Sequence, residues 1–246
     1  MSIALITGSC GLIGSESAYF FESKGLEIVG IDNNFRQFFF GKEGSTVWQK
    51  NKLKKKIKNY KHYNTDIRNY AHLEKIFRKF KKNIGIIIHC AAQPSHDYGK
   101  NFPILDFDVN AKGTLNMLEL TKLYCPNAVF IHMSTNKVYG DNPNKLNIIE
   151  RSKRWELNKI NKNYNGIKES FSLDNCTHSF FGVSKAYSDL IAQEYGSNVG
   201  LKTSIFRGGC ITGPNHSGAK LHGFLSYLVK VSLKEKKYSM IGYKGK

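Results

Sequence analysis

The chain has 246 residues, 41% of them hydrophobic and 23% charged, which suits one large globular domain, or a domain and a smaller lobe, with an ample core. No apolar run approaches the roughly 20 residues that span a bilayer, and the first residues lack the basic region and cleavage site of a secretory signal. We therefore expect a cytoplasmic protein without a membrane-spanning segment.

The formal net charge of +18 comes largely from lysines spread along the whole chain, with the densest run at residues 49–61. No nucleic-acid-binding motif accompanies this run, and basic and aromatic residues do not interleave in an RNA-binding pattern. We therefore expect a solvated lysine-rich face and no nucleic-acid partner. The five cysteines occur singly and without zinc spacing, so we expect neither a disulfide framework nor a metal site.

Apolar β-branched runs alternate with helical patterns, which predicts a doubly wound parallel sheet with helices on both faces. Strands are expected at residues 3–7, 27–32, 62–66, 84–92, 128–135, 202–207 and 238–242. Helices are expected at residues 12–25, 73–80, 110–124, 184–196 and 221–234. Two stretches lack such a pattern, a basic and aromatic insertion at 35–60 and an irregular polar insertion at 140–177.

A glycine motif, Gly8-x-x-Gly11-x-x-Gly14, lies between the first expected strand and the first expected helix. Its glycines allow a tight turn and close approach of a pyrophosphate to the backbone, as in the Rossmann fold. Asp32 ends the second strand about 20 residues on, where a carboxylate can bond the ribose hydroxyls of NAD. It would repel a 2′-phosphate, so NAD is expected over NADP, although Arg36 leaves that preference open. The flanking residues expected at the cofactor are Leu12, Ile13, Asn33 and Asn34.

The glycine spacing resembles the extended short-chain dehydrogenase/reductase family, and further motifs agree with it. "NTDIRN" matches the family's adenine-contacting pair, here Asp66 and Ile67. "VNAKGTLNMLE" matches a family helix that begins at Asn110 beside the cofactor. "HCAAQPS" resembles a strand end that lies against the cofactor, which implies contacts from Ala91, Ala92 and Gln93. The resemblance implies an NAD-binding Rossmann domain over residues 1–207 and a smaller substrate lobe over 208–246.

The strand end "STNKVYGD" matches the family position of the catalytic Ser or Thr, which is Thr135 here. In the family a Tyr-x-x-x-Lys pair follows, one helical turn apart; the tyrosine removes the proton of the sugar hydroxyl. The lysine is present as Lys185 and would also hold the nicotinamide ribose, but Phe181 replaces the tyrosine. A second departure is Cys210, where relatives often carry an asparagine.

Three interpretations of the missing tyrosine stay open. Another base can act: His178, Tyr164, or Lys185 working through Thr135 or a water, whereas Tyr187 points away on a 3.6-residue helix. Activity can be lower but real, because one acid/base group is commonly worth about 10²–10⁴ in rate. Finally, the chain can be a degenerate NAD-binding module.

Within the family, "AAQPSHD", "STNKVYGD" and "FRGGCITGPNHSGAKLHGF" resemble the branch of CDP-paratose 2-epimerases. This resemblance implies a nucleotide-sugar substrate, oxidised at C2 by NAD and reduced again on its other face. A 4-epimerase or a 4,6-dehydratase of the same family is the alternative. A dehydratase should carry an Asp-Glu pair after the Ser/Thr position, and Asn136 and Lys137 stand there instead.

Two loops and two helices complete the expectations. His96 and Asp97 follow a cofactor-contacting strand, so a substrate role and an ordinary polar loop are both open, and the loop 214–223 is expected to contact substrate. Relatives continue past the last expected strand, which implies a truncated substrate lobe in this chain. The helical segments 115–124 and 186–195 offer faces for a homodimer, although such helices also pack internally.

Overall fold

The computed structural model describes residues 2–220, 222–235 and 237–239, and its centre is a six-stranded parallel sheet. The strand order is β3-β2-β1-β4-β5-β8, and every neighbouring pair is parallel. The strands are β1 (Ile3–Thr7), β2 (Glu27–Ile31), β3 (Lys61–Tyr63), β4 (Ile84–His89), β5 (Val129–Thr135) and β8 (Lys202–Gly208). This order confirms the predicted doubly wound fold, and it places a crossover between β1 and β4, where such sheets bind ligands.

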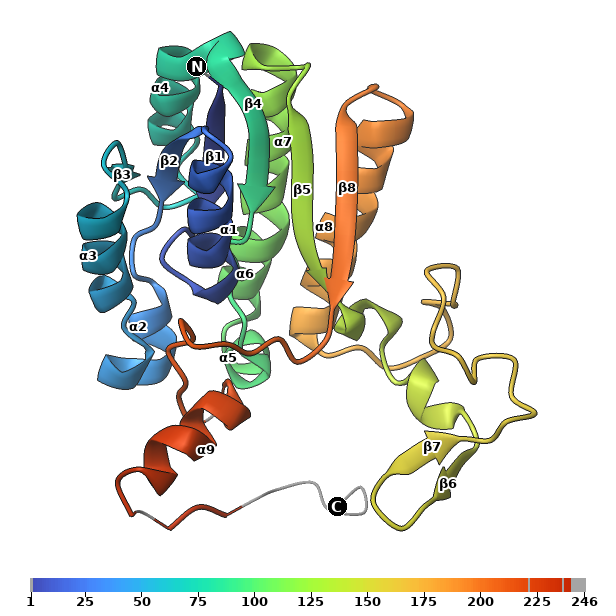
Figure 1. Cartoon of the computed structure of the whole chain (residues 1–246). Coiled ribbons are helices and arrows are strands. Elements are labelled where there is room, and N and C mark those ends of the chain that lie inside the picture. Colours follow the sequence, from blue (N-terminus) through green and yellow to red (C-terminus); the bar gives the residue numbers. More distant parts are fainter. Residues whose placement is uncertain (1, 221, 236, 240–246) are drawn as a thin grey trace.

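Helices cover both faces of the sheet (Figure 1). They are α1 (Leu12–Ser23), α2 (Arg36–Phe40), α3 (Val47–Lys56), α4 (Tyr70–Phe80), α5 (His96–Asn101), α6 (Pro103–Phe107), α7 (Gly113–Tyr124), α8 (Phe180–Ser197) and α9 (Phe224–Ser232). A π-helical turn, Asp108–Lys112, joins α6 to α7. One core packs α4, α7 and α8 against the sheet, and a second packs α1 and α3 against its other face.

Helix α4 illustrates why these segments fold as predicted. Leu73, Ile76, Phe77 and Phe80 form one buried stripe at helical spacing. Asn69 caps the helix by accepting a hydrogen bond from the backbone N–H of His72 at 3.0 Å. Each fully buried large apolar side chain of this kind stabilises the fold by about 1.5–3 kcal/mol.

Several predicted boundaries differ from the structure. Strand β4 ends at His89 rather than at residue 92, because the chain then passes directly over Gly8. Helix α8 begins at Phe180 rather than at residue 184, since Ser179 caps it by accepting from the N–H of Gly182 at 3.0 Å. Residues 238 and 239 have no regular structure, and the remainder of the strand expected at 238–242 lies outside the described residues.

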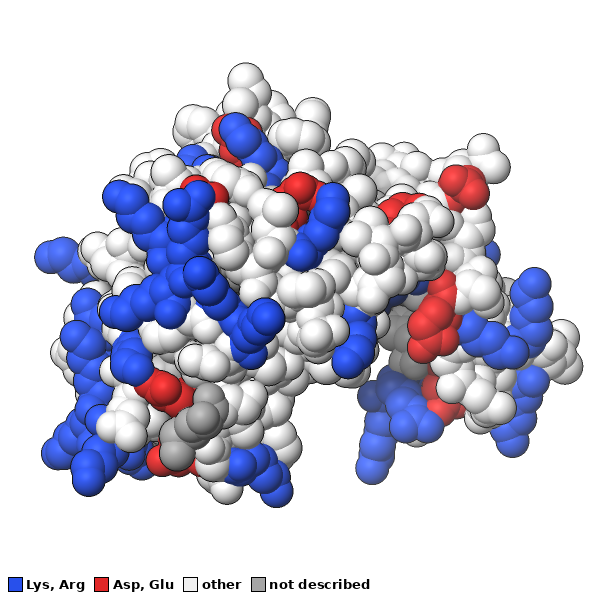
Figure 2. Space-filling view, turned by 90° about the horizontal axis from the view of Figure 1, so that it is seen from above, with Lys and Arg blue, Asp and Glu red and all other residues white. Residues whose placement is uncertain are grey.

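The insertion at 35–60 folds into α2, a 3₁₀ turn (Gly41–Gly44) and α3. Helix α3 buries Gln49 and Leu53 and turns Lys54, Lys55 and Lys56 to solvent. Figure 2 shows many Lys and Arg side chains at the left of the face seen from above and a second group at its right, with acidic side chains scattered among them. This arrangement agrees with a solvated lysine-rich face.

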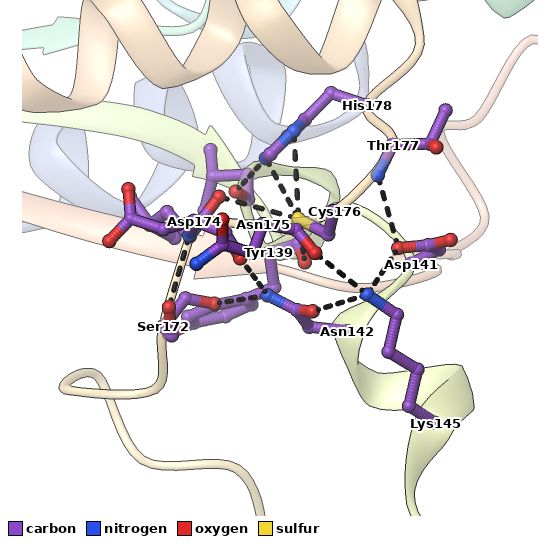
Figure 3. Close-up of polar contacts among 12 residues, drawn as sticks. Tyr139, Asp141, Asn142, Lys145, Ser172, Asp174, Asn175, Cys176, Thr177 and His178 are labelled. Carbon is purple, nitrogen blue, oxygen red and sulfur yellow. Dashed lines mark hydrogen bonds and ion pairs between the residues drawn. The ribbon is translucent and has the colours of Figure 1, made fainter.

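The insertion at 140–177 contains an antiparallel hairpin, β6 (Ile148–Glu150) and β7 (Trp155–Leu157), which the prediction of an irregular stretch missed. The hairpin lies away from the central sheet (Figure 1). Polar contacts tie the two ends of the insertion together (Figure 3): Asn142 donates to the carbonyl oxygens of Ser172 and Asp174, and the backbone N–H of Thr177 donates to Asp141. Among the described residues, no helix has the length and apolar character to cross a membrane.

Candidate active site

A cavity of about 560 Å³ opens at the carboxyl ends of the parallel strands. It runs from the glycine turn after β1 to the ends of β5 and β8 and the first turns of α8. The predicted site residues that line it are Gly8, Gly11, Leu12, Ile13, Gly14, Asp32, Asn33, Asp66, Ile67, Ala91, Ala92, Thr135 and Lys185. Segments far apart in the sequence therefore form one continuous wall.

The glycine turn is too tightly packed for side chains. Gly8 has a φ of +63°, and a Cβ there would lie 2.8 Å from the backbone nitrogen of Ala91. A Cβ on Gly14 would lie 2.2 Å from the carbonyl oxygen of Gly8. Helix α1 follows with Gly11 at its N-cap and no side chain capping its first N–H groups. These free donors and the bare backbone fit the pyrophosphate of a dinucleotide.

Two carboxylates mark the nucleoside end of the cavity. Asp32 accepts from the backbone N–H of Cys10 at 2.9 Å and of Asn34 at 2.8 Å, and burial raises its pKa. Asp66 accepts from Nδ2 of Asn33 at 3.0 Å and from Nε and Nη2 of Arg68 at 2.9 and 2.8 Å. Burial alone would raise the pKa of Asp66, but the hydrogen bonds from Arg68 lower it. Asp32 keeps lone pairs for further donors, which fits ribose hydroxyls. Asp66 also accepts from the backbone N–H of Arg68 at 2.9 Å, so its acceptor positions are already filled by Asn33 and Arg68.

Arg36 lies on the same wall but is held by another segment. Its Nη2 donates to the carbonyl oxygen of Ser217 at 2.9 Å and lies 3.1 Å from Nδ1 of His222. Burial lowers the pKa of Arg36 to about 10, and its Nε has no partner. Trp48 joins this anchor by donating from Nε1 to Oγ of Ser217 at 2.9 Å. The loop 214–223, predicted to contact substrate, is thus fixed to the insertion at 35–60 and reaches the cavity through His216, Ser217, His222 and Gly223.

Three predicted cofactor residues, Asn34, Gln93 and Asn110, are not among the lining residues. Gln93 is fully buried; its backbone N–H donates to Oδ1 of Asn110 at 2.8 Å, and its Nε2 donates to Oδ1 of Asp106 at 2.6 Å. Asn110, in the π-helical turn, donates to Oγ of Ser184 on α8 at 3.0 Å. Asn34 accepts from the backbone N–H of residue 46 at 2.8 Å. These side chains hold together the segments that line the cavity and do not line it themselves. We therefore expect any contribution they make to cofactor binding to be indirect.

The opposite end of the cavity holds Thr135, Phe181 and Lys185. Phe181 and Lys185 share one face of α8, and both side chains are buried. Nζ of Lys185 donates to the carbonyl oxygen of Met133 at 2.8 Å, and burial lowers its pKa to about 8. Oγ1 of Thr135 accepts from the backbone N–H of Lys137 at 3.2 Å. Because the Phe181 side chain has no exchangeable proton, this end of the cavity lacks the tyrosine hydroxyl expected there as the acid/base group.

The suggested replacements from the sequence lie elsewhere. His178 precedes α8, and its Nε2 lies 2.8 Å from the carbonyl oxygen of Val138, beside Cys176 (Figure 3). Tyr164 is 40% exposed on the insertion at 140–177, and neither it nor His178 lines the cavity. Tyr187 packs against Phe107, with ring centroids 5.9 Å apart, as expected for a side chain on another face of α8.

The sequence did not single out His96, an aromatic neighbour of Phe181, as a base. The ring of His96 lies edge-on to that of Phe181, with centroids 4.9 Å apart, and it lines the cavity. Lys137, Cys90 and Cys210 also line this end. The signal for His96 was its place directly after the strand end "HCAAQPS". Among the described residues, no group of three or more His, Cys, Asp or Glu side chains is arranged to hold a metal ion.

Comparisons with known proteins agree with this geometry. The chain is 32% identical over 209 residues to a CDP-paratose 2-epimerase of Salmonella typhi, covering 82% of this chain and 55% of that protein. It is 33% identical over 144 residues to a UDP-glucuronate 4-epimerase of Thermodesulfobacterium geofontis, covering 58% of this chain and 42% of that protein. The chain thus spans about half the length of these curated relatives.

Solved structures share the fold. A UDP-glucose 4-epimerase of Thermus thermophilus, solved in complex with NAD, superposes with a TM-score of 0.71 at 24% identity, covering 96% of this chain and 64% of that one. The model of the NAD dependent epimerase/dehydratase family matches residues 4–246, nearly the whole sequence. The family is defined by its use of NAD, in agreement with the cofactor predicted from the glycine turn and Asp32. The chain belongs to the NAD dependent epimerase/dehydratase family.

Proposed function

We propose that this protein binds NAD and epimerises a nucleotide-linked deoxysugar, with the CDP-paratose/CDP-tyvelose pair at C2 as the first candidate. The observation that carries the proposal is the single cavity that joins the glycine turn and Asp32 to Thr135 and Lys185. The likeness to the Salmonella typhi CDP-paratose 2-epimerase supports the choice of substrate. Residues 1–207 would form the cofactor domain, and 208–246 would belong to a substrate lobe.

Each end of the cavity has a distinct task in this proposal. The backbone from Gly8 to Gly14 would hold the pyrophosphate, Asp32 the adenosine ribose, and Asp66 with Ile67 the adenine. NAD held there would supply the acceptor and donor of the hydride that leaves and rejoins the sugar carbon. Lys185, with a pKa of about 8, is mostly protonated at neutral pH and would donate to the nicotinamide ribose. Thr135 would hydrogen-bond the reacting hydroxyl.

The residues after Thr135 favour an epimerase over a dehydratase. The chain is also 26% identical over 228 residues to a dTDP-glucose 4,6-dehydratase of Salmonella typhimurium, so dehydration is one enzyme alternative beside 4-epimerisation. Eliminating water from a sugar needs an acid and a base beside the hexose. Asn136 and Lys137 line the cavity there, and neither is a carboxylic acid. A degenerate NAD-binding module is the non-catalytic alternative, favoured by Phe181.

We also propose that two copies pair through α8 and the neighbouring α6–α7 segment. Val183, Tyr187 and Leu190 form a stripe on α8 that is 57%, 37% and 47% exposed. Phe107, 50% exposed, lies against Tyr187, and Leu123 on α7 is 57% exposed. Leu190→Glu should convert the dimer to a monomer in light scattering. The matched change in the similarly exposed α1 residue, Phe20→Glu, should not.

The experiment that tests the function is incubation of the purified protein and NAD with CDP-paratose, followed by proton NMR of the sugar. We expect CDP-tyvelose to accumulate to equilibrium. UDP-glucose and dTDP-glucose, the substrates of the alternative reactions, should remain unchanged. Conversion of dTDP-glucose to a 4-keto-6-deoxy sugar would support the dehydratase instead, and tight NAD binding without conversion of any sugar would support the module.

A further inference from the structure

The site as described leaves the proton of the reacting hydroxyl without an acceptor. A replacement must lie beside Phe181, face the cavity and change protonation near neutral pH. Thr135 cannot do this, because a hydroxyl is not a base at neutral pH. The ammonium group of Lys185 donates to the carbonyl oxygen of Met133. Burial raises the pKa of the Cys90 thiol to about 12, so this thiol stays protonated at neutral pH.

His96 meets all three conditions. It lies at the start of α5, directly after the loop that leaves β4, and its ring is edge-on to Phe181 at 4.9 Å. Its side chain is exposed toward the cavity that it lines, together with Thr135 and Lys185. A tyrosine at position 181 would present its hydroxyl near this wall, so the imidazole occupies a neighbouring position across the same space.

A hydrogen bond fixes the orientation of the ring. Nδ1 of His96 lies 3.0 Å from Oγ of Ser179, the residue that caps α8 by accepting from the N–H of Gly182. A hydroxyl oxygen has two acceptor positions, so Oγ can also accept from Nδ1–H. Nε2 then carries a free lone pair in the neutral ring, and the same bond persists when the ring is protonated. The cap of α8 thus ties His96 to the helix that carries Phe181 and Lys185.

We propose that His96 is the catalytic acid/base of this site, in place of the tyrosine that Phe181 replaces. This inference rests on the proposed function. In the oxidation, the O–H bond of the sugar breaks and its proton passes to Nε2, while the hydride of the same carbon passes to NAD⁺ and a C=O bond forms. In the reduction, the hydride returns to the other face of that carbon, and Nε2–H returns the proton to the oxygen.

The charges around His96 favour a neutral ring that can accept a proton. Burial lowers the pKa of His96, and Lys137 on the loop after β5 lowers it further. Asp97 on α5 and Asp106 on α6 act in the opposite direction. His222, on the loop before α9, also interacts electrostatically with His96. Burial lowers the pKa of His222 to about 3, so His222 stays neutral and adds no positive charge beside His96.

Other histidines do not serve this role. His178 does not line the cavity, and its Nε2 lies 2.8 Å from the carbonyl oxygen of Val138. The rings of His216 and His222 lie against each other, with centroids 5.7 Å apart, and His222 lies beside Arg36. His96 is the histidine among the described lining residues that contacts Phe181.

The test compares epimerisation by wild type, His96→Gln and the double variant His96→Gln/Phe181→Tyr. We expect His96→Gln to lower turnover by about 10²–10⁴-fold with unchanged NADH affinity, because one acid/base group is removed. The double variant should recover at least a tenth of the wild-type rate, because the tyrosine restores a proton acceptor beside Lys185. The acid limb of the wild-type rate profile, set by His96 below its usual pKa of about 6.5, should disappear in the double variant.

His178→Gln is the matched control and should keep the wild-type rate. Wild-type turnover in His96→Gln would overturn the role of His96 and leave the proposed function standing. Loss of turnover that Phe181→Tyr does not restore would assign His96 to structure or substrate binding and would also overturn it. A wild-type protein that binds NADH but converts no sugar nucleotide would overturn the proposed function itself, and the role of His96 with it.

Discussion

The two ends of the cavity are built in different ways. The nucleoside end consists of backbone and short motifs: a glycine turn, an uncapped helix start, and carboxylates at the ends of β2 and after β3. The sugar end consists of side chains from α5, β5 and α8, which meet only in the folded protein. The proposed cofactor contacts therefore follow from local sequence, whereas the proposed proton transfer depends on contacts across the fold.

The largest effect is expected at the sugar end. Lys185→Met removes the buried ammonium that would hold the nicotinamide ribose and polarise the site. We expect turnover to fall by about 10²–10⁴-fold, with a much smaller change in NADH affinity. Steady-state rates and NADH fluorescence titration measure the two separately. An equal loss of both would mean that the two ends are not separate in function.

The same residue gives a pH-dependent stability. The folded-state pKa of Lys185 is about 8 against an ordinary value of 10.5, so between these pH values the unfolded chain binds more protons. Raising the pH through this window therefore increases the free energy of unfolding of wild type relative to that of Lys185→Met. The expected increase is about 3 kcal/mol, since each unit of pKa difference corresponds to about 1.36 kcal/mol. Urea unfolding of both proteins at pH 7 and 10.5 measures this difference. An unchanged difference would mean that Lys185 is solvated in the folded protein.

A smaller effect is expected at the nucleoside end. Gly14→Ala places a Cβ 2.2 Å from the carbonyl oxygen of Gly8, so the turn must open. Strain of about 1–3 kcal/mol should weaken NADH binding by roughly 10- to 100-fold. Gly25→Ala is the control: its φ of +82° carries a similar strain, but the residue lies at the end of α1, away from the cavity. It should lower stability and leave NADH affinity unchanged.

The smallest effect concerns cofactor choice. Asp32→Asn keeps the shape of the side chain and removes its charge. We expect roughly 10-fold weaker NADH binding, since a hydrogen bond to a charged group contributes about 1.5–3 kcal/mol and a neutral one about 0.5–1.5 kcal/mol. We also expect a smaller preference for NADH over NADPH. Competitive titration with both nucleotides measures this. A preference that does not change would point to Arg36 or the loop 214–223 as the selecting group.

The sequence alone predicted the sheet, its order of elements and most of the nucleoside end, because hydrophobic periodicity and the glycine motif are local signals. It placed the start of α8 too late, although Ser179 is a strong capping residue, because small residues at Gly182 and Ser184 weaken the helical pattern. It missed the β6–β7 hairpin, whose strands of three residues carry little periodicity.

The contact between His96 and Phe181 could not be predicted from local sequence patterns. The two residues lie on separate helices. Their rings meet because β4 and β5 are neighbouring parallel strands, so the segments that follow them lie at the same edge of the sheet. The sequence also assigned Gln93 to the cofactor, whereas its side chain donates to Asp106 and to the backbone of Ser95. Both outcomes depend on which way a loop residue turns, which no spacing rule specifies.

The most direct test of the central claim is the absorption band of reduced nicotinamide in a single turnover. Purified protein loaded with NAD⁺ is mixed with CDP-paratose, and the band is followed in wild type and in His96→Gln. We predict a transient band in wild type that decays as CDP-tyvelose forms, and in His96→Gln a band that appears much more slowly. Bound NAD⁺ that no sugar nucleotide reduces in wild type would contradict this prediction.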